Sequence, residues 1–287
     1  MAIILDGKNL RNEIAAKLKA VVDEKLEKGF VKPSLAIVQI GNNKESETYI
    51  RNKKRFGESI GVNVLHVHLP EEIEQTEVQK EIKNLNEDES VDGIILQLPI
   101  PKHLHKEMLI ESISLKKDVD GLTSRSVKGL WIDSGTSLMP ATTRGILSLL
   151  KKYDVSLSGK KVVVVGRSAL VGKPTALALL NKGATVTICH SETKDLEAQT
   201  VEADIIVAAV GRPRLISRHH VRPGQIIIDV GTTIENPDDR KCVGDADFED
   251  IKDIVAMISP VPGGVGPMTV ASLFENVVDV YLRKTMI

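Results

Sequence analysis

A set of side chains suited to acid–base chemistry lies in the segment 46–56. Ser46, Tyr49, Lys53 and Phe56 stand at positions i, i+3, i+7 and i+10, which places them on one face of a predicted helix. A lysine that is shielded from water beside an aromatic ring has a lowered pKa, so it can exchange protons near neutral pH. The competing interpretation is a surface lysine whose stem covers a core tyrosine.

Two later segments place groups where a ligand could be held. Gln97, in DGIILQLPIP, stands at the carboxyl end of a predicted strand, the edge at which open α/β sheets bind ligands. In KDVDG, the carboxyl groups of Asp118 and Asp120 could bind a ring that bears N–H donors, although an aspartate turn is the competing interpretation. The segment PVPGGVGPMT, residues 260–269, gives stiff turns with little side-chain bulk, which a flat ligand can approach closely.

A glycine turn at 166–172 predicts a dinucleotide site. The apolar strand 160–165 runs into GRSALVG, and a helix begins near Lys173. This order offers free backbone N–H groups and the positive end of a helix to a pyrophosphate. The spacing departs from GxGxxG, because Ser168 stands at the second glycine position and the final glycine comes one residue late. An ordinary strand-to-helix turn is therefore the competing interpretation.

The end of the next strand favours NADP over NAD. An NAD site usually carries an acid there for the ribose 2′-hydroxyl, whereas this chain reads CHSETKD, with His190 and Ser191 at the tip. Together with Arg167 in the glycine turn, a hydroxyl and a cation can meet a 2′-phosphate. Glu192, one residue further on, argues against this assignment.

The elements that must position these groups alternate between short apolar strands and amphipathic helices. This pattern predicts an α/β fold with parallel sheets. Helices are expected at 7–29, 44–60, 76–85, 144–153 and 269–284, and strands at 34–41, 63–70, 92–101, 160–166, 184–190, 203–211, 225–231 and 253–261. The polar stretch 116–143 is expected to form an active-site wall and a connection between domains.

Size and composition narrow the class of protein further. A chain of 287 residues favours two domains with a cleft between them. Lys and Arg total 38 against 39 Asp and Glu, without a charged block, so neither nucleic acid nor a membrane surface is an expected partner. No signal peptide or transmembrane span is expected. Cys189 and Cys242 match no metal or redox spacing, and the histidine pairs lack a third ligand, so a reduced, cytoplasmic protein without a metal is expected.

In order and spacing, the segments SETYIRNKK, DGIILQLPIP, KDVDGL, VVVVGRSALVGKP, CHS, DVG, VGDADF and PVPGGVGPMTVA resemble the bifunctional methylenetetrahydrofolate dehydrogenase/cyclohydrolase family. The resemblance covers nearly the whole chain. It implies oxidation of 5,10-methylenetetrahydrofolate with NADP, followed by hydrolysis of the methenyl product to 10-formyltetrahydrofolate. It also implies a folate domain at 1–139 completed by the helix 268–287, a Rossmann-like NADP domain at 140–267, and a homodimer formed through the NADP domain.

The resemblance also implies a role for individual residues. Lys53 becomes the acid/base of the hydration step, Tyr49 the platform under the benzoyl ring, Gln97 the group that tunes Lys53, and Asp120 the anchor of the pterin. The other substrate-binding positions are Ser46, Leu98, Pro99, Pro262, Gly263 and Gly264. The cofactor-binding positions are Gly166, Arg167, Ser168, Gly172, Ser191, Gly211, Gly231, Thr232, Gly266 and Thr269.

Two segments depart from the family pattern, and two other functions compete. PATT at 140–143 replaces the commoner PCTP, and DVGTT at 229–233 replaces DVGIN.

A shikimate dehydrogenase-like enzyme would leave PVPGGVGPMT beside Tyr-x-x-x-Lys unexplained. A nucleotide-sensing regulator would have no use for Lys53, Gln97 and Asp120 in one cluster.

Overall fold

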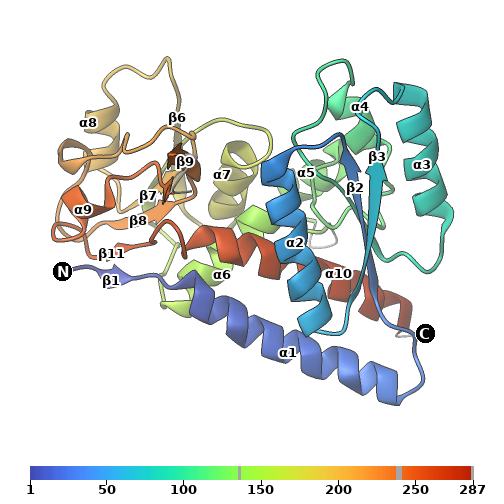
Figure 1. Cartoon of the computed structure of the whole chain (residues 1–287). Coiled ribbons are helices and arrows are strands. Elements are labelled where there is room, and N and C mark those ends of the chain that lie inside the picture. The colour runs from blue at the N-terminus through green and yellow to red at the C-terminus, as the bar shows by residue number, and fades with distance from the viewer. Residues whose placement is uncertain (135–136, 237–240, 286–287) are drawn as a thin grey trace. The chain divides into compact units, whose positions relative to one another are not determined.

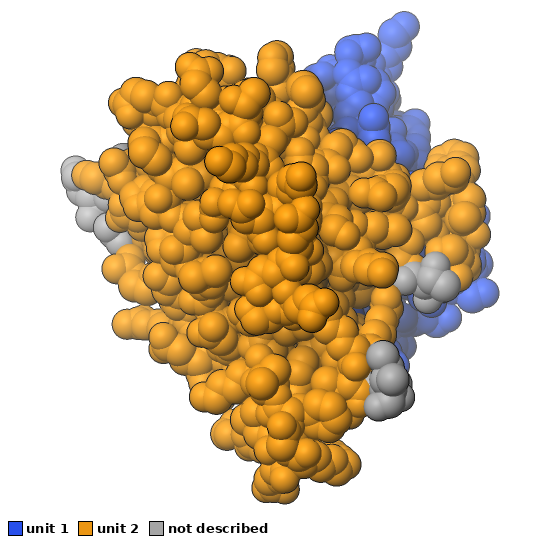
Figure 2. All heavy atoms as spheres, turned by 90° about the vertical axis from the view of Figure 1, so that its right-hand side faces the viewer, with its two compact units in different colours: residues 1–11, 142–269 blue, residues 12–141, 270–287 orange. Residues whose placement is uncertain are grey.

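The computed structural model of the chain describes residues 1–134, 137–236 and 241–285. The chain forms two units, which Figure 2 shows in different colours. Unit 1 contains Met1–Arg11 and Thr142–Thr269, and unit 2 contains Asn12–Ala141 and Val270–Ile287. The three boundaries fall inside α1 (Gly7–Glu27), α10 (Val265–Thr285) and the first turn of α6 (Ala141–Lys152). Each unit is therefore assembled from segments that are distant in the sequence.

Unit 1 is built on a six-stranded parallel sheet with the strand order β1-β11-β8-β7-β5-β6. The strands are β1 (Ile3–Ile4), β5 (Lys161–Val165), β6 (Thr185–Cys189), β7 (Ile205–Ala208), β8 (Ile226–Asp229) and β11 (Met257–Ile258). β5 and β7 read as continuous apolar runs because both of their faces are buried, as is typical of parallel sheets. The strand order changes direction at β5, because β6 lies on one side of β5 and β7 on the other. The carboxyl ends of β5 and β7 therefore form the edge at which such sheets bind ligands.

The remaining elements of unit 1 connect these strands (Figure 1). They are α6 (Ala141–Lys152), α7 (Gly172–Asn181), α8 (Leu196–Val201), the 3-10 helix η1 (Arg218–His220), α9 (Phe248–Ile251) and the hairpin of β9 (Thr233–Asn236) and β10 (Lys241–Val243). α7 follows β5 directly and leads into β6, so the glycine turn lies between a strand and a helix as predicted.

Unit 2 contains a three-stranded parallel sheet with the order β3-β2-β4. Its strands are β2 (Ser34–Ile40), β3 (Asn63–Leu69) and β4 (Gly93–Leu96), and its helices include α2 (Lys44–Ser59), α3 (Gln75–Glu87), α4 (Lys106–Glu111) and α5 (Ser124–Trp131). All seven residues of β2 are buried. Alternate residues of β2 and β4 pack with α3 and α4 in one apolar cluster, and α2 runs along the sheet beside β3.

The last part of α10 belongs to the core of unit 2. The ring of Phe274 lies 5.2 Å from that of Phe56 on α2, and the amide of Asn276 donates to the carbonyl groups of Val119 and Met139. Near the end of the helix, Lys284 forms an ion pair of 2.7 Å with the buried carboxylate of Asp92. The final residues of the chain thus stabilise a unit whose other residues precede 142.

The α/β class and the parallel sheet are confirmed, and the differences are local. The polar stretch 116–143 contains the short helix α5, which sequence analysis missed. The predicted strand 253–261 is reduced to the two residues of β11, because residues 252–256 form the turn after α9. Residues 1–11 lie with unit 1, since β1 pairs with β11. The assignment of a folate domain to 1–139 and an NADP domain to 140–267 stays a prediction.

Candidate active site

Lys53 is positioned by the helix that follows the central strand of unit 2. The side chain of Asn43 accepts a hydrogen bond of 2.9 Å from the backbone N–H of Ser46, which caps the start of α2. Ser46 is buried, and its hydroxyl donates to the carbonyl oxygen of Leu98 at 3.3 Å. Phe56 anchors the same face of the helix in the core. The predicted face is thus held at both ends, and Lys53 lies between them.

The ammonium group of Lys53 meets Gln97 just beyond the end of β4. Lys53 Nζ donates to Gln97 Oε1 at 2.8 Å, and Gln97 Nε2 donates to the carbonyl oxygen of Leu98 at 2.8 Å. The second bond fixes which end of the amide faces the lysine. Gln97 is 8% exposed, so the amide is held with its oxygen toward the amine.

Asp120 completes what we call the lysine cluster, defined as Lys53, Gln97 and Asp120. The segment before Asp120 runs beside β4, with a backbone hydrogen bond of 2.8 Å from Ile94 to Lys117, and so brings Asp120 to the same sheet edge as Gln97. Burial lowers the pKa of Lys53, and the nearby carboxylate of Asp120 partly opposes this shift. Burial also raises the pKa of Asp120. The cluster therefore holds an amine that loses its proton more readily than a surface lysine does.

The neighbouring predicted residues lie in different surroundings. Asp118 is buried and its carboxylate accepts from the backbone N–H groups of Leu122 and Thr123 and from the hydroxyl of Ser126. The turn interpretation therefore holds for Asp118, because its carboxylate oxygens accept hydrogen bonds from residues at the start of α5. Tyr49 is 47% exposed, which leaves much of its ring open to a ligand.

The glycine turn of unit 1 is packed too tightly for side chains. A Cβ at Gly166, whose φ is +132°, would lie 2.2 Å from the carbonyl oxygen of Ala209, and a Cβ at Gly172 would lie 2.1 Å from the carbonyl oxygen of Gly166. The first contact brings the turn after β5 against the end of β7. The second brings the start of α7 against the same turn, so both glycines are required by close backbone approach.

Free backbone donors line this turn. Within the described part of the chain, the N–H groups of residues 167–170 donate to no acceptor. Ser168 stands at the second glycine position, and its hydroxyl accepts from the N–H groups of Val171 and of Gly172, the first residue of α7, at 3.2 Å. Gly211, after β7, has φ +67° and open space where a Cβ would lie. Donors at a helix start beside bare backbone fit a dinucleotide pyrophosphate.

Arg167 and Ser191 lie at neighbouring strand ends of unit 1, as the 2′-phosphate hypothesis requires. Arg167 is the second residue after β5, and Ser191 lies in the exposed turn that follows β6. Arg167 also forms an ion pair with Glu192 in that turn.

The segment 260–269 belongs to unit 1. Its first half packs on the start of α1, where the N–H of Lys8 donates to the carbonyl oxygen of Gly263 at 3.1 Å. Pro262 and Gly264 lie beside it in the same turn, and Gly266 has open space around its Cα. Thr269 donates to Thr142 at 3.3 Å. Within the PATT segment, Thr142 thus supplies a hydroxyl contact to Thr269.

A buried pair of carboxylates near the predicted cofactor residues was missed. Asp229, at the end of β8, accepts from the N–H groups of Gly231, Asp245 and Ala246 at 2.9–3.0 Å. Asp245 is fully buried and accepts from the N–H groups of Val210 and Gly211. The pair therefore fixes the loops after β7 and β8, while Thr232 is exposed beside Gly231. Asp229 and Asp245 stand in the DVG and VGDADF motifs, which are the only sequence signal for them.

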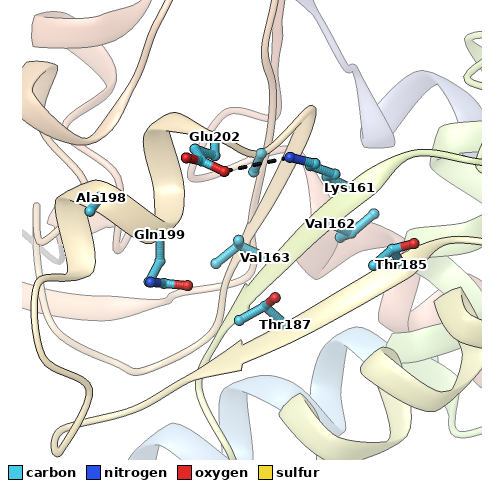
Figure 3. Close-up of a pocket in the computed structure, with 9 residues that line it drawn as sticks. Lys161, Val162, Val163, Thr185, Thr187, Ala198, Gln199 and Glu202 are labelled. Carbon is cyan, nitrogen blue, oxygen red and sulfur yellow. Dashed lines mark hydrogen bonds and ion pairs between the residues drawn. The ribbon is translucent and has the colours of Figure 1, made fainter.

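A pocket in unit 1 lies apart from these groups. It opens between α8 and the strands β5 and β6, lined among others by Lys161, Thr185 and Glu202 (Figure 3). Lys161 and Thr185 are the first residues of their strands, so this pocket reaches the amino ends of the sheet. Dinucleotides bind at the carboxyl ends, and the pocket is therefore a separate feature.

Neither a metal cluster nor a membrane span occurs in the part of the chain that the structure describes. No group of three or more His, Cys, Asp or Glu residues is placed to hold a metal ion there. None of the helices in residues 1–134, 137–236 and 241–285 has the length and hydropathy needed to cross a membrane.

The parallel sheet, its glycine turn and the free donors of 167–170 define a dinucleotide-binding α/β protein. Two family models match the chain: residues 5–120 match the catalytic domain, and residues 140–285 the NAD(P)-binding domain, of tetrahydrofolate dehydrogenase/cyclohydrolase. The chain belongs to the tetrahydrofolate dehydrogenase/cyclohydrolase family.

Individual relatives agree with this assignment over nearly their full length. The bifunctional protein FolD of Listeria innocua is 44% identical to this chain, and the match covers 96% of each of the two sequences. The crystal structure of the bifunctional FolD enzyme from Campylobacter jejuni has a TM-score of 0.96 at 41% identity, covering 99% of this chain and 100% of that one. The Trypanosoma brucei enzyme, solved with NADP and an inhibitor, has a TM-score of 0.94 at 34% identity, covering 99% and 98%.

Shikimate dehydrogenases share the fold at lower similarity. The enzyme from Aquifex aeolicus is 14% identical with a TM-score of 0.53, covering 85% of this chain and 91% of that one. This likeness shows the fold alone, and the shikimate dehydrogenase-like alternative is set aside by the family assignment.

Proposed function

We propose that the chain oxidises 5,10-methylenetetrahydrofolate with NADP and hydrolyses the methenyl product to 10-formyltetrahydrofolate, with the lysine cluster as the site of the hydrolytic step. The single observation that carries this proposal is the hydrogen bond from Lys53 to the oriented amide of Gln97, beside Asp120. Membership of a dehydrogenase/cyclohydrolase family supports both activities.

Hydration of the methenyl cation calls for a neutral base. Methenyltetrahydrofolate carries a delocalised positive charge, so a protonated lysine would be repelled by it. Burial lowers the pKa of Lys53 and makes the neutral amine accessible. The amine takes a proton from the attacking water as the water oxygen bonds to the methenyl carbon. It then returns a proton to the ring nitrogen that leaves as the ring opens, and the second water proton is released.

Gln97 and Asp120 set the state of that amine. The Gln97 oxygen accepts a hydrogen bond from the lysine and so directs the Nζ atom. The Asp120 carboxylate opposes the effect of burial on the Lys53 pKa. We assign Asp120 a second role as the anchor of the pterin, and Tyr49 the role of a platform under the benzoyl ring. Ser46, Leu98 and Pro99 would form the wall beside them.

The glycine turn would hold NADP. The free N–H groups of 167–170 would bind its phosphates, and Arg167 with Ser191 its 2′-phosphate. The remaining parts of NADP would be contacted by the other predicted cofactor-binding residues, which are Gly211, Gly231, Thr232, Gly266 and Thr269. When bound, NADP supplies the hydride acceptor, which needs close positioning of two rings and no protein nucleophile. We assign Pro262, Gly263 and Gly264 to the binding of the folate ring that meets the nicotinamide.

Replacing Lys53 with methionine tests the assignment. Lys53→Met should lower cyclohydrolase activity by about 10²–10⁴-fold, because a general base is lost, while some hydride transfer is kept. Both steps are followed in one spectrophotometric assay with methylenetetrahydrofolate and NADP, through the reduced cofactor and the methenyl chromophore.

Lys54→Met is the matched control. Lys54 lies next in the helix but contacts His66 at 3.1 Å instead of the lysine cluster, so this variant should keep both activities. Equal retention of both activities in Lys53→Met would show that the catalytic role is misassigned. Loss of both in Lys54→Met would show that the helix tolerates no change.

The finer assignments of partner and compartment complete the proposal. We place the protein in the cytoplasm as a homodimer formed through the NADP domain, supplying formyl groups to purine biosynthesis. Both cysteines are free thiols, as suits a reducing compartment. β6 lies at the end of the sheet order with exposed side chains, which offers an edge for self-association.

A further inference from the structure

The turn after β6 carries an acid at the place where an NADP site calls for positive charge. The backbone N–H of Thr193 donates to the carbonyl oxygen of His190 at 2.9 Å, and the N–H of His190 donates to the Thr193 hydroxyl at 2.8 Å. The N–H of Glu192 donates to His190 Nδ1 at 3.2 Å. These bonds close a four-residue turn with Ser191 and Glu192 at its two central positions.

The carboxylate of Glu192 reaches across to the glycine turn. Its Oε1 atom lies 2.5 Å from Nη2 of Arg167. The Arg167 side chain is 48% exposed and that of Glu192 is 73% exposed. Ion pairs this exposed contribute little to folding stability, so the contact is not needed to hold the two turns together. Its consequence is electrostatic, because the carboxylate cancels the charge of the guanidinium.

We propose that Glu192 is a specificity-determining residue that weakens the preference of this enzyme for NADP over NAD by pairing with Arg167. The inference rests on the proposed function, in which Arg167 and Ser191 receive the 2′-phosphate. An incoming 2′-phosphate must displace the Glu192 carboxylate from Arg167. The phosphate then lies close to this negatively charged carboxylate, which repels it. The 2′-hydroxyl of NAD meets no such penalty, and a carboxylate at this strand end can accept its hydrogen bond.

The glutamine variant isolates the charge while keeping the size of the side chain. Glu192→Gln should raise kcat/KM for NADP by about fivefold, the upper range for an exposed ion pair, while kcat/KM for NAD stays the same or falls. Both constants are measured with methylenetetrahydrofolate by initial rates of cofactor reduction. Glu197→Gln is the control, because Glu197 is an exposed acid on α8 in the same unit and its loss changes net charge equally.

A second background tests whether the effect passes through Arg167. In the Arg167→Ala variant, the gain from Glu192→Gln should shrink, because there is no guanidinium to release. An equal gain in both backgrounds, an unchanged NADP to NAD ratio, or the same rise in Glu197→Gln would overturn the inference. Absence of cofactor reduction with either dinucleotide in the unaltered chain would instead overturn the proposed function.

Discussion

In the proposed mechanism, single side chains in the lysine cluster set the pH at which the hydrolytic step runs. Two influences act on the Lys53 amine in opposite directions: burial lowers its pKa, and the charge of Asp120 raises it. Gln97 is uncharged and contributes a directed hydrogen bond. A residue that changes this balance should therefore move the pH dependence of hydrolysis without a direct part in the chemistry.

Two charge changes should shift the cyclohydrolase profile in opposite directions. Activity rises with pH as the Lys53 amine becomes neutral. Asp120→Asn removes the negative charge that raises the Lys53 pKa, so the rising limb should move to lower pH. Gln97→Glu adds a negative charge beside the amine, so the limb should move to higher pH. The measurement is kcat against pH with isolated methenyltetrahydrofolate, and shifts of the same sign in both variants would contradict the role given to Lys53.

The lysine cluster could be largely predicted from the sequence, whereas the buried carboxylates could not. Helical spacing places Lys53 on the face of Ser46 and Phe56, and the strand-end rule places Gln97 at a ligand edge. Asp229 and Asp245 meet only because the loop after β10 returns beside β8. No periodicity links residues with that separation, and each could equally have been a turn residue.

At the scale of elements, β6 is an edge strand with largely exposed side chains. It ends the sheet order of unit 1, with β5 as its only neighbour among the described strands. Its exposed residues include Ile188 at 40%. An exposed edge strand presents unpaired backbone N–H and C=O groups with which another chain can pair, and this supports the homodimer proposed for this unit.

A charge on β6 should therefore dissociate the dimer. Ile188→Lys is expected to convert a dimer into a monomer, because the lysine would have to be buried against the partner. Ile234→Lys is the matched control, since Ile234 on β9 is 41% exposed in the same unit. Molar mass by light scattering after gel filtration is the readout. A dimer that survives Ile188→Lys would place the interface elsewhere, and a monomeric unaltered chain would remove the dimer from the proposal.

Elements with a continuous apolar sequence pattern could be predicted, and the shortest elements could not. β5 is nearly all valine and runs into a glycine turn, so both its type and its end follow from the sequence. α5 escaped prediction because its buried face is limited to a few positions such as Leu130 within a polar stretch. β1 contains two residues and pairs with β11 more than 250 positions away, a contact that local patterns do not encode.

At the scale of the whole molecule, the buried Asp229 links stability to pH. The residue is 3% exposed. Burial raises the pKa of Asp229 from 3.8 to about 7, against the three N–H groups that favour its charged form. The folded state therefore keeps a proton that the unfolded chain releases at lower pH. Stability contributed by this group is lost as the pH rises between these two values and stays constant above the higher one.

The free energy of unfolding should show this loss. Between about pH 5 and about pH 8, the unaltered chain should lose on the order of 2–3 kcal/mol relative to Asp229→Asn, which cannot ionise. Urea unfolding of both proteins at each pH gives the difference, and the comparison cancels the pH dependence of groups that do not interact with Asp229. A difference that is constant with pH would show that Asp229 is already charged in the folded state.

The return of α10 to unit 2 imposes an order on biosynthesis. A ribosome completes residues 12–141 well before it reaches Phe274, Asn276 and Lys284, which cover that core and pair with it. At typical elongation rates of about 5–20 residues per second, the delay is roughly ten seconds. The nascent half-built unit is thus left with uncovered apolar surface while unit 1 is synthesised, which makes it a natural client for chaperones that bind emerging chains.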